Sequence, residues 1–345
     1  NLIINGAMQV AQRGTSFTGL TNGTSKTYTL DRFAWAESGS TTATFSVTQE
    51  TDSPDGFSNS LKISPSTSGG GHNVIEIIHS IEAQNLQHFA FGSSNAKSFT
   101  LSFWVKCSQS GTGTVSFYNL DALRQRAENY TINSADTWEY KTITVSGDTS
   151  GSFNNDNGTG LSVYFPIAAS SSYNDGTTGV WGSYDDGKRG GGMTIDLTGS
   201  TSDYLQITGV QLEVGSVATP FEHRSYGEEL ALCQRYYNMY AKDSVSNGNA
   251  PIGMGHYYSS SLMNCIVSLP VTMRSNPTLD QGSGSLYFNF TRNNGSDGFD
   301  DFYLGDSQPN CVRISNSTDM GGTAGEAGNV GTSNSASYLA FDAEL

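Results

Sequence analysis

One loop of the sequence gathers the residue types from which sugar-binding sites are built. It spans residues 170–192 and places aromatic rings beside charged, planar side chains in a glycine-rich tract. The candidate binding residues are Tyr173, Trp181, Tyr184, Asp185, Asp186 and Arg189. An aromatic ring can cover the apolar face of a pyranose while its polar tip faces water, and carboxylate and guanidinium groups can hydrogen-bond sugar hydroxyls. These residues indicate a carbohydrate-binding loop.

Packing is the competing interpretation of the same aromatic residues. For Trp181 we favour packing, because large aromatic side chains are usually buried and this one can close one end of a β-sandwich. For Tyr184 and the acids beside it, sugar binding and packing beside Trp181 remain about equally open interpretations.

The sequence contains no motif of a catalytic site. It has no G-x-S-x-G, H-E-x-x-H or phosphate-binding loop, and no G-x-G-x-x-G that follows a strand. Carboxylates are plentiful, and the paired acids of a glycosidase come together in space rather than in sequence. A polysaccharide depolymerase therefore stays as a third hypothesis, and we expect no enzymatic activity.

Metal-binding patterns are equally weak. The sequence has four cysteines at widely separated positions: Cys107, Cys233, Cys265 and Cys311. They form no zinc-ligand spacing. The oxygen-rich segments 153–158 and 297–303 could ligate Ca²⁺, but neither has EF-hand spacing, so turn formation better explains them. We expect no cofactor, with a structural calcium as the alternative.

The composition excludes several classes of partner. The 345 residues carry a formal net charge of −15 and no basic cluster, which argues against binding to nucleic acid. No apolar run approaches the roughly 20 residues that span a bilayer, so we expect no membrane insertion. Charged residues make up 14% and aromatic residues 11% of a chain rich in glycine and hydroxyl side chains. That composition favours an all-β protein with many turns.

Short segments of alternating hydrophobicity would position the candidate loop. The clearest is FTLSFWVKC, in which Phe99, Leu101, Phe103, Val105 and Cys107 share one face of a strand. The other expected strands of this series are 43–50, 73–82, 114–120, 137–147, 160–168 and 203–215.

Two positions interrupt these patterns. In the last segment the alternation slips by one residue at Gly209, which predicts a bulge there. Pro166 cannot donate a ladder hydrogen bond, which favours an edge strand or a bulge. His79, within the row of Ile75, Ile77 and Ile81, is expected to be structural.

A helix is expected where the strand series ends. Ser225 and Glu228 fit a capping box, and the helix would end near Lys242. Leu230, Cys233, Tyr237 and Tyr240 would then share one face. We expect a first domain over 1–222, a linker helix over 223–242 and a second β domain over 243–345. The expected strands of that domain are in 256–270, 284–292, 300–306, 310–316 and 337–345.

Several segments, in the same order, resemble bacteriophage tail-fibre and other virion structural proteins. They are NLIINGAMQVAQRGTSFT with TLDRFAW, IHSIEAQNLQHF with KSFTLSFWVK, YLQITGVQLEVGSVATPFEHRSYGEELALCQRYY, LPVTMRSNPTL and FDAEL. The resemblance covers nearly the whole chain. It implies a jelly-roll sandwich like those of carbohydrate-binding modules, then a short helix and a C-terminal β domain. Where related modules often carry acidic calcium ligands, this sequence has Ala7-Met8-Gln9 and Thr208-Gly209, so the ion is not implied.

The resemblance also implies a non-enzymatic place on the exterior of a phage particle, after assembly in the bacterial cytoplasm, often as a homotrimer among other virion proteins. Residues in and near the helix could form the contact between copies or between domains: Leu230, Cys233, Tyr236, Tyr237 and Tyr240. Packing within one chain is the alternative for these residues.

Three functional hypotheses follow. The first is a tail fibre or other virion appendage that recognises host-surface glycans by multivalent, non-catalytic binding. The second is a structural or decoration protein of the capsid or tail without a ligand. The third is the depolymerase.

Overall fold

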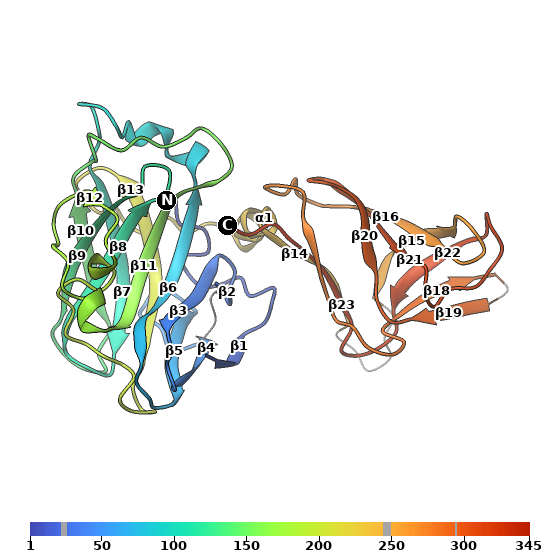
Figure 1. The fold of residues 1–345 in the computed structure, drawn as a ribbon, viewed down its shortest axis with the longest axis horizontal. Coiled ribbons are helices and arrows are strands. Elements are labelled where there is room, and N and C mark those ends of the chain that lie inside the picture. The colour runs from blue at the N-terminus through green and yellow to red at the C-terminus, as the bar shows by residue number, and fades with distance from the viewer. Residues whose placement is uncertain (22–25, 244–249, 294) are drawn as a thin grey trace. The chain divides into compact units, whose positions relative to one another are not determined.

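The computed structural model describes residues 1–21, 26–243, 250–293 and 295–345, and is almost entirely β (Figure 1). The expected fold class, a jelly-roll sandwich followed by a short helix and further β structure, is confirmed. The chain divides into two compact units, Asn1–Glu229 with Leu345, and Leu230–Glu344. No helix among the described residues is long and apolar enough to cross a membrane.

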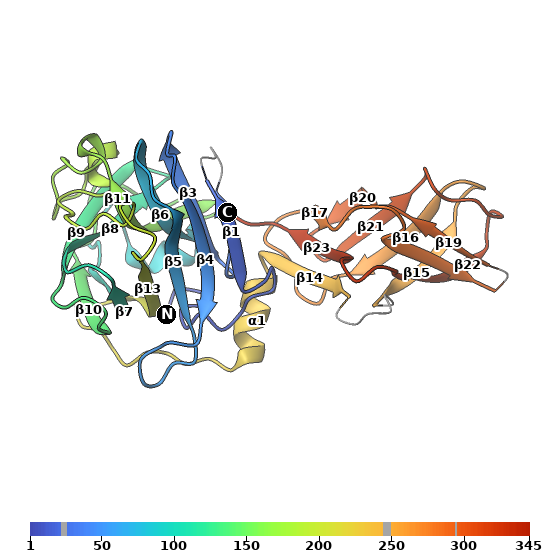
Figure 2. The same ribbon diagram turned by 90° about the horizontal axis from the view of Figure 1, so that it is seen from below.

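The first unit is a sandwich of two antiparallel sheets (Figure 2). The first sheet contains, in spatial order, β1 (Ser16–Leu20), β4 (Thr44–Glu50), β5 (Ser60–Thr67), β13 (Leu205–Val214), β7 (Phe99–Cys107) and β10 (Glu139–Val145). The second contains β12 (Gly182–Ser183), β9 (Arg124–Ile132), β8 (Gly111–Asn119), β11 (Thr159–Ala169), β6 (His72–Glu82), β3 (Phe33–Gly39) and β2 (Thr27–Tyr28). Short 3₁₀ turns occupy Ala83–Phe89, Ser171–Tyr173 and Asp186–Lys188.

The core lies between the two sheets because alternate residues of each strand face inward. The five residues predicted to share one face of β7 are all buried, including the Cys107 thiol. Phe103 of β7 meets Phe165 of β11 with ring centroids 5.4 Å apart, and Phe99 meets Phe117 of β8 at 5.1 Å. These edge-to-face contacts join the sheets and leave the opposite residues of each strand on the outer faces.

The two predicted irregularities are present. The register of β13 against β7 shifts between Thr208 and Gln211, and Gly209 has a φ of +61°, which favours glycine. Pro166 lies in β11, which pairs on both sides, and the register against β6 shifts between Pro166 and Ala168. The bulge accommodates this proline, and the pairing of β11 with β8 ends at Tyr164, before Pro166.

His79 is a structural residue, as expected. It is buried in β6, and its Nε2 lies 3.3 Å from the amide nitrogen of Ile4. Burial holds the pKa of His79 well below its usual value, so the imidazole is neutral at pH 7.

The predicted helix begins correctly and ends too late. The α1 helix spans Tyr226–Gln234, and Ser225 exchanges hydrogen bonds with Glu228, as a capping box requires. Residues Tyr237–Lys242 form strand β14 instead, paired with β23 (Tyr338–Asp342). Aromatic residues favour a pleated surface with a partner strand over a helix, and β23 supplies that partner from about 100 residues further along the chain.

The prediction that Leu230, Cys233, Tyr237 and Tyr240 share one face of a helix is therefore wrong, because α1 ends at Gln234. Cys233, Tyr236 and Tyr237 are fully buried, and Leu230 is partly buried. Within the second unit, the Tyr237 hydroxyl donates to Asp280 over 2.9 Å, and Tyr240 packs edge-on against Phe341. Both contacts are internal to that unit, as the packing alternative expects.

The second unit contains two further antiparallel sheets. One consists of β14, β23 and β17 (Thr278–Gln281). The other consists, in spatial order, of β19 (Gly295–Phe299), β18 (Phe288–Arg292), β22 (Ala327–Thr332), β15 (Pro251–Tyr257), β16 (Met263–Ser268), β21 (Cys311–Asn316) and β20 (Tyr303–Gln308). A separate cluster of buried aromatic and aliphatic side chains forms the core of this unit.

Candidate functional site

The candidate loop, residues 170–192, is fixed on the outer face of the second sheet of the first unit. Asn129 of β9 donates a 2.8 Å hydrogen bond to the carbonyl of Gly191. Near the middle of the loop, the amide of Asp185 donates to the side chain of Gln125, also on β9, over 3.1 Å. Because side chains of one strand, β9, hold both the middle and the end of this loop, the sheet positions the loop.

The loop and the sheet together form a polar and aromatic cluster, which we name the tyrosine–arginine face. Its members are Glu76 of β6, Tyr118 of β8, Tyr164 of β11, and Tyr184, Asp186 and Arg189 of the loop. Successive residues of a strand point to opposite faces, so the strand members lie outside while their neighbours Ile75, Phe117 and Phe165 enter the core.

Aromatic rings form the accessible part of this face. The Tyr118 and Tyr184 rings lie 4.8 Å apart between centroids at an interplanar angle of 48°. Tyr184 is 37% exposed and Tyr118 is partly exposed, whereas Tyr164 is buried. The Arg189 guanidinium lies 4.5 Å above the Tyr164 ring, a cation–π arrangement.

A chain of polar contacts holds the rings in place. Arg189 forms an ion pair with the fully buried Glu76, in which Nε donates to Oε2 over 3.1 Å. A second guanidinium nitrogen donates to the Tyr184 hydroxyl over 3.2 Å, and that hydroxyl donates to Asp186 over 2.5 Å. Each group therefore has a fixed orientation before any ligand arrives.

The surroundings of Arg189 and Tyr184 keep the guanidinium charged and the hydroxyl neutral. Burial lowers the pKa of Arg189 to about 10, so the guanidinium stays charged at neutral pH. Burial and the hydrogen bond to Asp186 both raise the pKa of Tyr184, so its hydroxyl stays protonated. The arrangement offers two ring faces, a cation and a carboxylate side by side, which can bind a polyhydroxylated molecule without reacting with it.

The remaining residues predicted for the sugar site lie around this cluster. Asp185 caps the 3₁₀ turn Asp186–Lys188 by accepting from the amide of Gly187 over 3.0 Å. Tyr173 is partly buried, and its carbonyl accepts from the amide of Gly190.

Trp181 packs against the edge of the core of the sandwich. Its ring meets Phe91 edge-on at 5.5 Å, and its indole donates to the carbonyl of Ser146 over 2.7 Å. These contacts are those that the packing interpretation expects.

Sequence patterns did not identify the strand members of the tyrosine–arginine face. Tyr118 and Tyr164 lie 46 residues apart in sequence, and only the pairing of β8 with β11 places them near each other. The sequence signal that could have found them is the alternation of their segments, which places Tyr118 and Tyr164 on the outward side of their strands.

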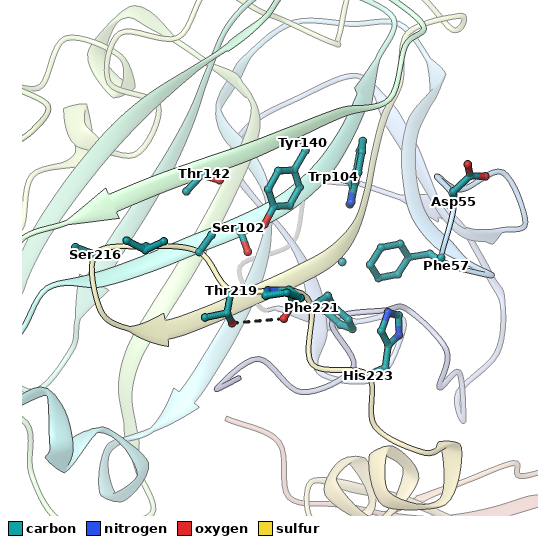
Figure 3. A pocket seen from close by; sticks show the side chains of 15 residues that line it. Asp55, Phe57, Ser102, Trp104, Tyr140, Thr142, Ser216, Thr219, Phe221 and His223 are labelled. Atoms are coloured by element: carbon teal, nitrogen blue, oxygen red, sulfur yellow. Dashed lines mark hydrogen bonds between the residues drawn. The ribbon is translucent and has the colours of Figure 1, made fainter.

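A second surface of the first unit, on the outer face of the first sheet, is an open groove of about 850 Å³ that we name the aromatic groove (Figure 3). The residues that define it are Phe57, Trp104, Tyr140, Thr142, Phe221 and His223. Sequence analysis assigned no site here. The alternation in FTLSFWVKC places Trp104 opposite the core face, and this could have shown that it lies outside.

The floor of the aromatic groove is a pair of rings on neighbouring strands. Trp104 of β7 lies directly across from Tyr140 of the edge strand β10, with ring centroids 5.4 Å apart at 49°. Trp104 is partly exposed and Tyr140 is 45% exposed. The next outward pair, Ser102 and Thr142, continues the floor with hydroxyl groups.

The walls come from two segments that are far apart in sequence. Phe57, in the connection between β4 and β5, meets Phe221 at 5.0 Å and His223 at 5.3 Å. Residues Phe221 and His223 belong to the segment Ser216–His223, which follows β13 and which we call the strap. Figure 3 shows the strap passing beside the floor rings, with Phe57 and His223 at one end.

Metal binding has no support from the described part of the chain, where no three His, Cys, Asp or Glu side chains are grouped closely enough to hold an ion. In the oxygen-rich segment 297–303, Asp297 pairs with Arg292, and Asp300 accepts from the amide of Leu286 over 2.8 Å. These contacts are those of turn and strand residues.

Comparisons with known proteins identify no family. No protein-family model and no curated protein matches the chain. Solved structures with some similarity include the enzymatically active domain of bacteriophage CBA120 tailspike protein 4, at 15% identity and a TM-score of 0.30, covering 52% of this chain and 19% of that one. A xylan-binding domain of carbohydrate-binding module family 22 matches at 13% identity and a TM-score of 0.32, covering 60% of this chain and 98% of that one.

A family 11 carbohydrate-binding module from Clostridium thermocellum, in complex with a β-1,3-1,4-mixed-linked tetrasaccharide, matches at 12% identity and a TM-score of 0.28. It covers 60% of this chain and 99% of that one. The chain spans about a fifth of the tailspike structure. At these scores the similarities carry no argument about function.

Proposed function

We propose that this protein is a non-enzymatic appendage protein of a bacteriophage particle, such as a tail fibre, and that its first unit binds host-surface glycans. The tyrosine–arginine face is the proposed site, with Tyr118 and Tyr184 as the ring contacts and Arg189 and Asp186 as the hydrogen-bonding groups.

One observation carries the glycan part of the proposal. The Tyr118–Tyr184 pair is held at 4.8 Å beside a guanidinium whose direction is fixed by the buried Glu76. Ring stacking supplies contact area, and pre-oriented planar groups supply hydrogen bonds without a large ordering cost. The ordered sequence segments that resemble phage tail-fibre proteins support the particle role.

Multivalency suits a site of this kind. A small exposed surface binds weakly, and linking several copies in one assembly raises the overall avidity by 10²–10⁴ when the geometry permits simultaneous contact. We therefore propose a homotrimer that contacts other virion proteins and lies on the particle exterior.

The test is binding of the intact protein to arrayed bacterial surface polysaccharides, followed by titration of each positive glycan. Light scattering first establishes how many copies the assembly contains. Tyr184→Ala should weaken binding about fivefold, because the loss of one stacked ring costs about 1 kcal/mol. Tyr258→Ala is the matched control, since this tyrosine is 70% exposed but lies in the second unit.

The other hypotheses predict different results. If no glycan binds the assembled protein, the glycan-binding proposal is wrong and a structural or decoration role in the capsid or tail is favoured. If reducing ends are released from a bacterial polysaccharide, the protein is a depolymerase and the non-enzymatic part of the proposal is wrong.

A further inference from the structure

We propose that the aromatic groove is a second saccharide-binding site, specific for neutral sugars, on the sheet opposite the tyrosine–arginine face. This inference rests on the proposed glycan-binding function, because it gives the same class of ligand to a separate surface. One chain would then hold two glycan sites, one on the outer face of each sheet.

The floor is the first reason. The informative observation about a surface is an exposed cluster of large apolar groups rather than a single one. Trp104 and Tyr140 form such a cluster at 5.4 Å, and the Ser102–Thr142 pair places hydroxyl groups directly beside it. Rings bordered by hydroxyl groups match a pyranose, which has an apolar face and a polar edge.

The walls are the second reason, because hydrogen bonds to β13 hold the strap in place. Glu213 of β13 holds the strap by accepting from the Thr219 amide over 2.9 Å and from its hydroxyl over 2.8 Å. Gln211 accepts from the Glu222 amide over 2.8 Å. A pre-formed concave site of several hundred Å³ is typical of ligand pockets and lowers the entropic cost of binding.

The bulge in β13 is what allows the floor and the wall to meet. A Cβ atom on Gly209 would lie 2.7 Å from the Phe57 ring and 3.1 Å from the Trp104 ring. The glycine thus lets Phe57 from the wall approach the indole of the floor, and the groove closes at that end. Gly209 thus accounts both for the bulge in β13 and for the closed end of the aromatic groove.

The charge of the lining is the third reason and selects neutral sugars. Among the described residues that line the groove, none is Lys or Arg, and Asp55 supplies a carboxylate. A phosphate or an acidic sugar would meet no Lys or Arg there and would be repelled by a chain of net charge −15. The hydroxyl and carboxylate groups also distinguish the lining from a purely apolar acyl-chain site.

The experiment titrates the intact protein with neutral oligosaccharides of glucose, galactose and mannose and with uronic-acid oligosaccharides of the same length. Tyr140→Ala removes an exposed floor ring, and Thr142→Arg fills the groove from an exposed position on an edge strand. Thr131→Arg is the matched control, because it makes the same change at an exposed position of β9 on the other sheet.

Both groove variants should weaken binding of a neutral oligosaccharide about fivefold or more, the scale of a lost ring contact. Thr131→Arg and Tyr184→Ala should bind it as the wild type does. The bound sugar should also change the tryptophan fluorescence, and Trp104→Phe should abolish that change while retaining an aromatic floor.

The outcomes separate the two proposals. If Tyr140→Ala and Thr142→Arg bind every oligosaccharide like the wild type while Tyr184→Ala does not, the groove site is overturned and the tyrosine–arginine face stands. If the groove variants lose binding while Tyr184→Ala binds every glycan normally, the groove site stands and the first site is overturned. Absence of any saccharide binding overturns both.

Discussion

The pKa of a single side chain depends strongly on the polar groups around it, as Glu139 at the start of β10 shows. Its carboxylate accepts from the Lys141 ammonium over 2.6 Å, from the Asn133 side chain over 2.6 Å and from the Ser134 amide over 2.9 Å. Burial acts against its ionisation, but these contacts together outweigh burial and lower the pKa of Glu139 to about 2.

This shift predicts a pH-dependent contribution to stability. A carboxyl whose pKa is lower in the folded state stabilises the fold above its unfolded-state value of 4.5, and the contribution disappears as pH falls toward 2. Glu139→Gln should therefore cost about 1 kcal/mol of unfolding free energy at pH 7, the scale of a partly exposed ion pair. The difference from the wild type should shrink steadily between pH 4.5 and pH 2.

Urea unfolding followed by tryptophan fluorescence measures this, because Trp35, Trp104, Trp138 and Trp181 all lie in the first unit. Asp306→Asn, at a side chain 84% exposed in the second unit, controls for the change in net charge. A stability difference that stays constant with pH would contradict the assignment.

At the level of elements, the bulge in β13 has two structural effects, and the sequence pattern predicts only the first. It restores the inward direction of Val210 and Leu212, which are both buried. It also leaves Gly209, without a side chain, between the Phe57 and Trp104 rings. The same residue therefore serves the core on one face of the sheet and the aromatic groove on the other.

Gly209→Ala should lower the unfolding free energy by about 2 kcal/mol, because an L-residue is strained at a φ of +61° and the added methyl group meets two rings. The same variant should weaken sugar binding in the aromatic groove. Gly199→Ala is the matched control, since a Cβ there meets open space. Equal stability of the two variants, measured by urea unfolding, would show that the bulge tolerates a side chain.

At the level of the whole molecule, the chain holds two hydrophobic cores. The core of the first unit lies between its two sheets, and the second unit has its own cluster around Phe288, Phe290 and Phe341. Each core is made within one compact unit, so a substitution in one is expected to act on that unit.

Heating in a calorimeter should therefore give two transitions rather than one. Phe103→Ala should destabilise the first unit by about 3–5 kcal/mol, the cost of removing a buried phenylalanine. It should lower the midpoint temperature of only one transition, the one that tryptophan fluorescence also follows. Phe341→Ala should lower the other transition, and each variant is the control for the other. A single transition that both variants shift equally would refute independent unfolding.

Features that depend on neighbours along the chain could be predicted from the sequence. The period of two in FTLSFWVKC identified the inward residues of β7, because alternate side chains of a strand leave water together. Ser225 and Glu228 identified the start of α1, since a capping box is a contact across three residues. In the loop 170–192, Tyr184, Asp186 and Arg189 contact one another because they lie close together along the chain.

Features that need partners from elsewhere in the chain are visible only in the folded molecule. Residues Tyr237–Lys242 became a strand because β23 pairs with them, a contact that local spacing does not encode. Tyr118 and Glu76 joined the loop residues because β8, β11 and β6 lie side by side, and Tyr140 joined Trp104 through the register of β10 against β7. The packing of distant strands fixes such contacts, whereas the sequence pattern records only which face of each strand is buried.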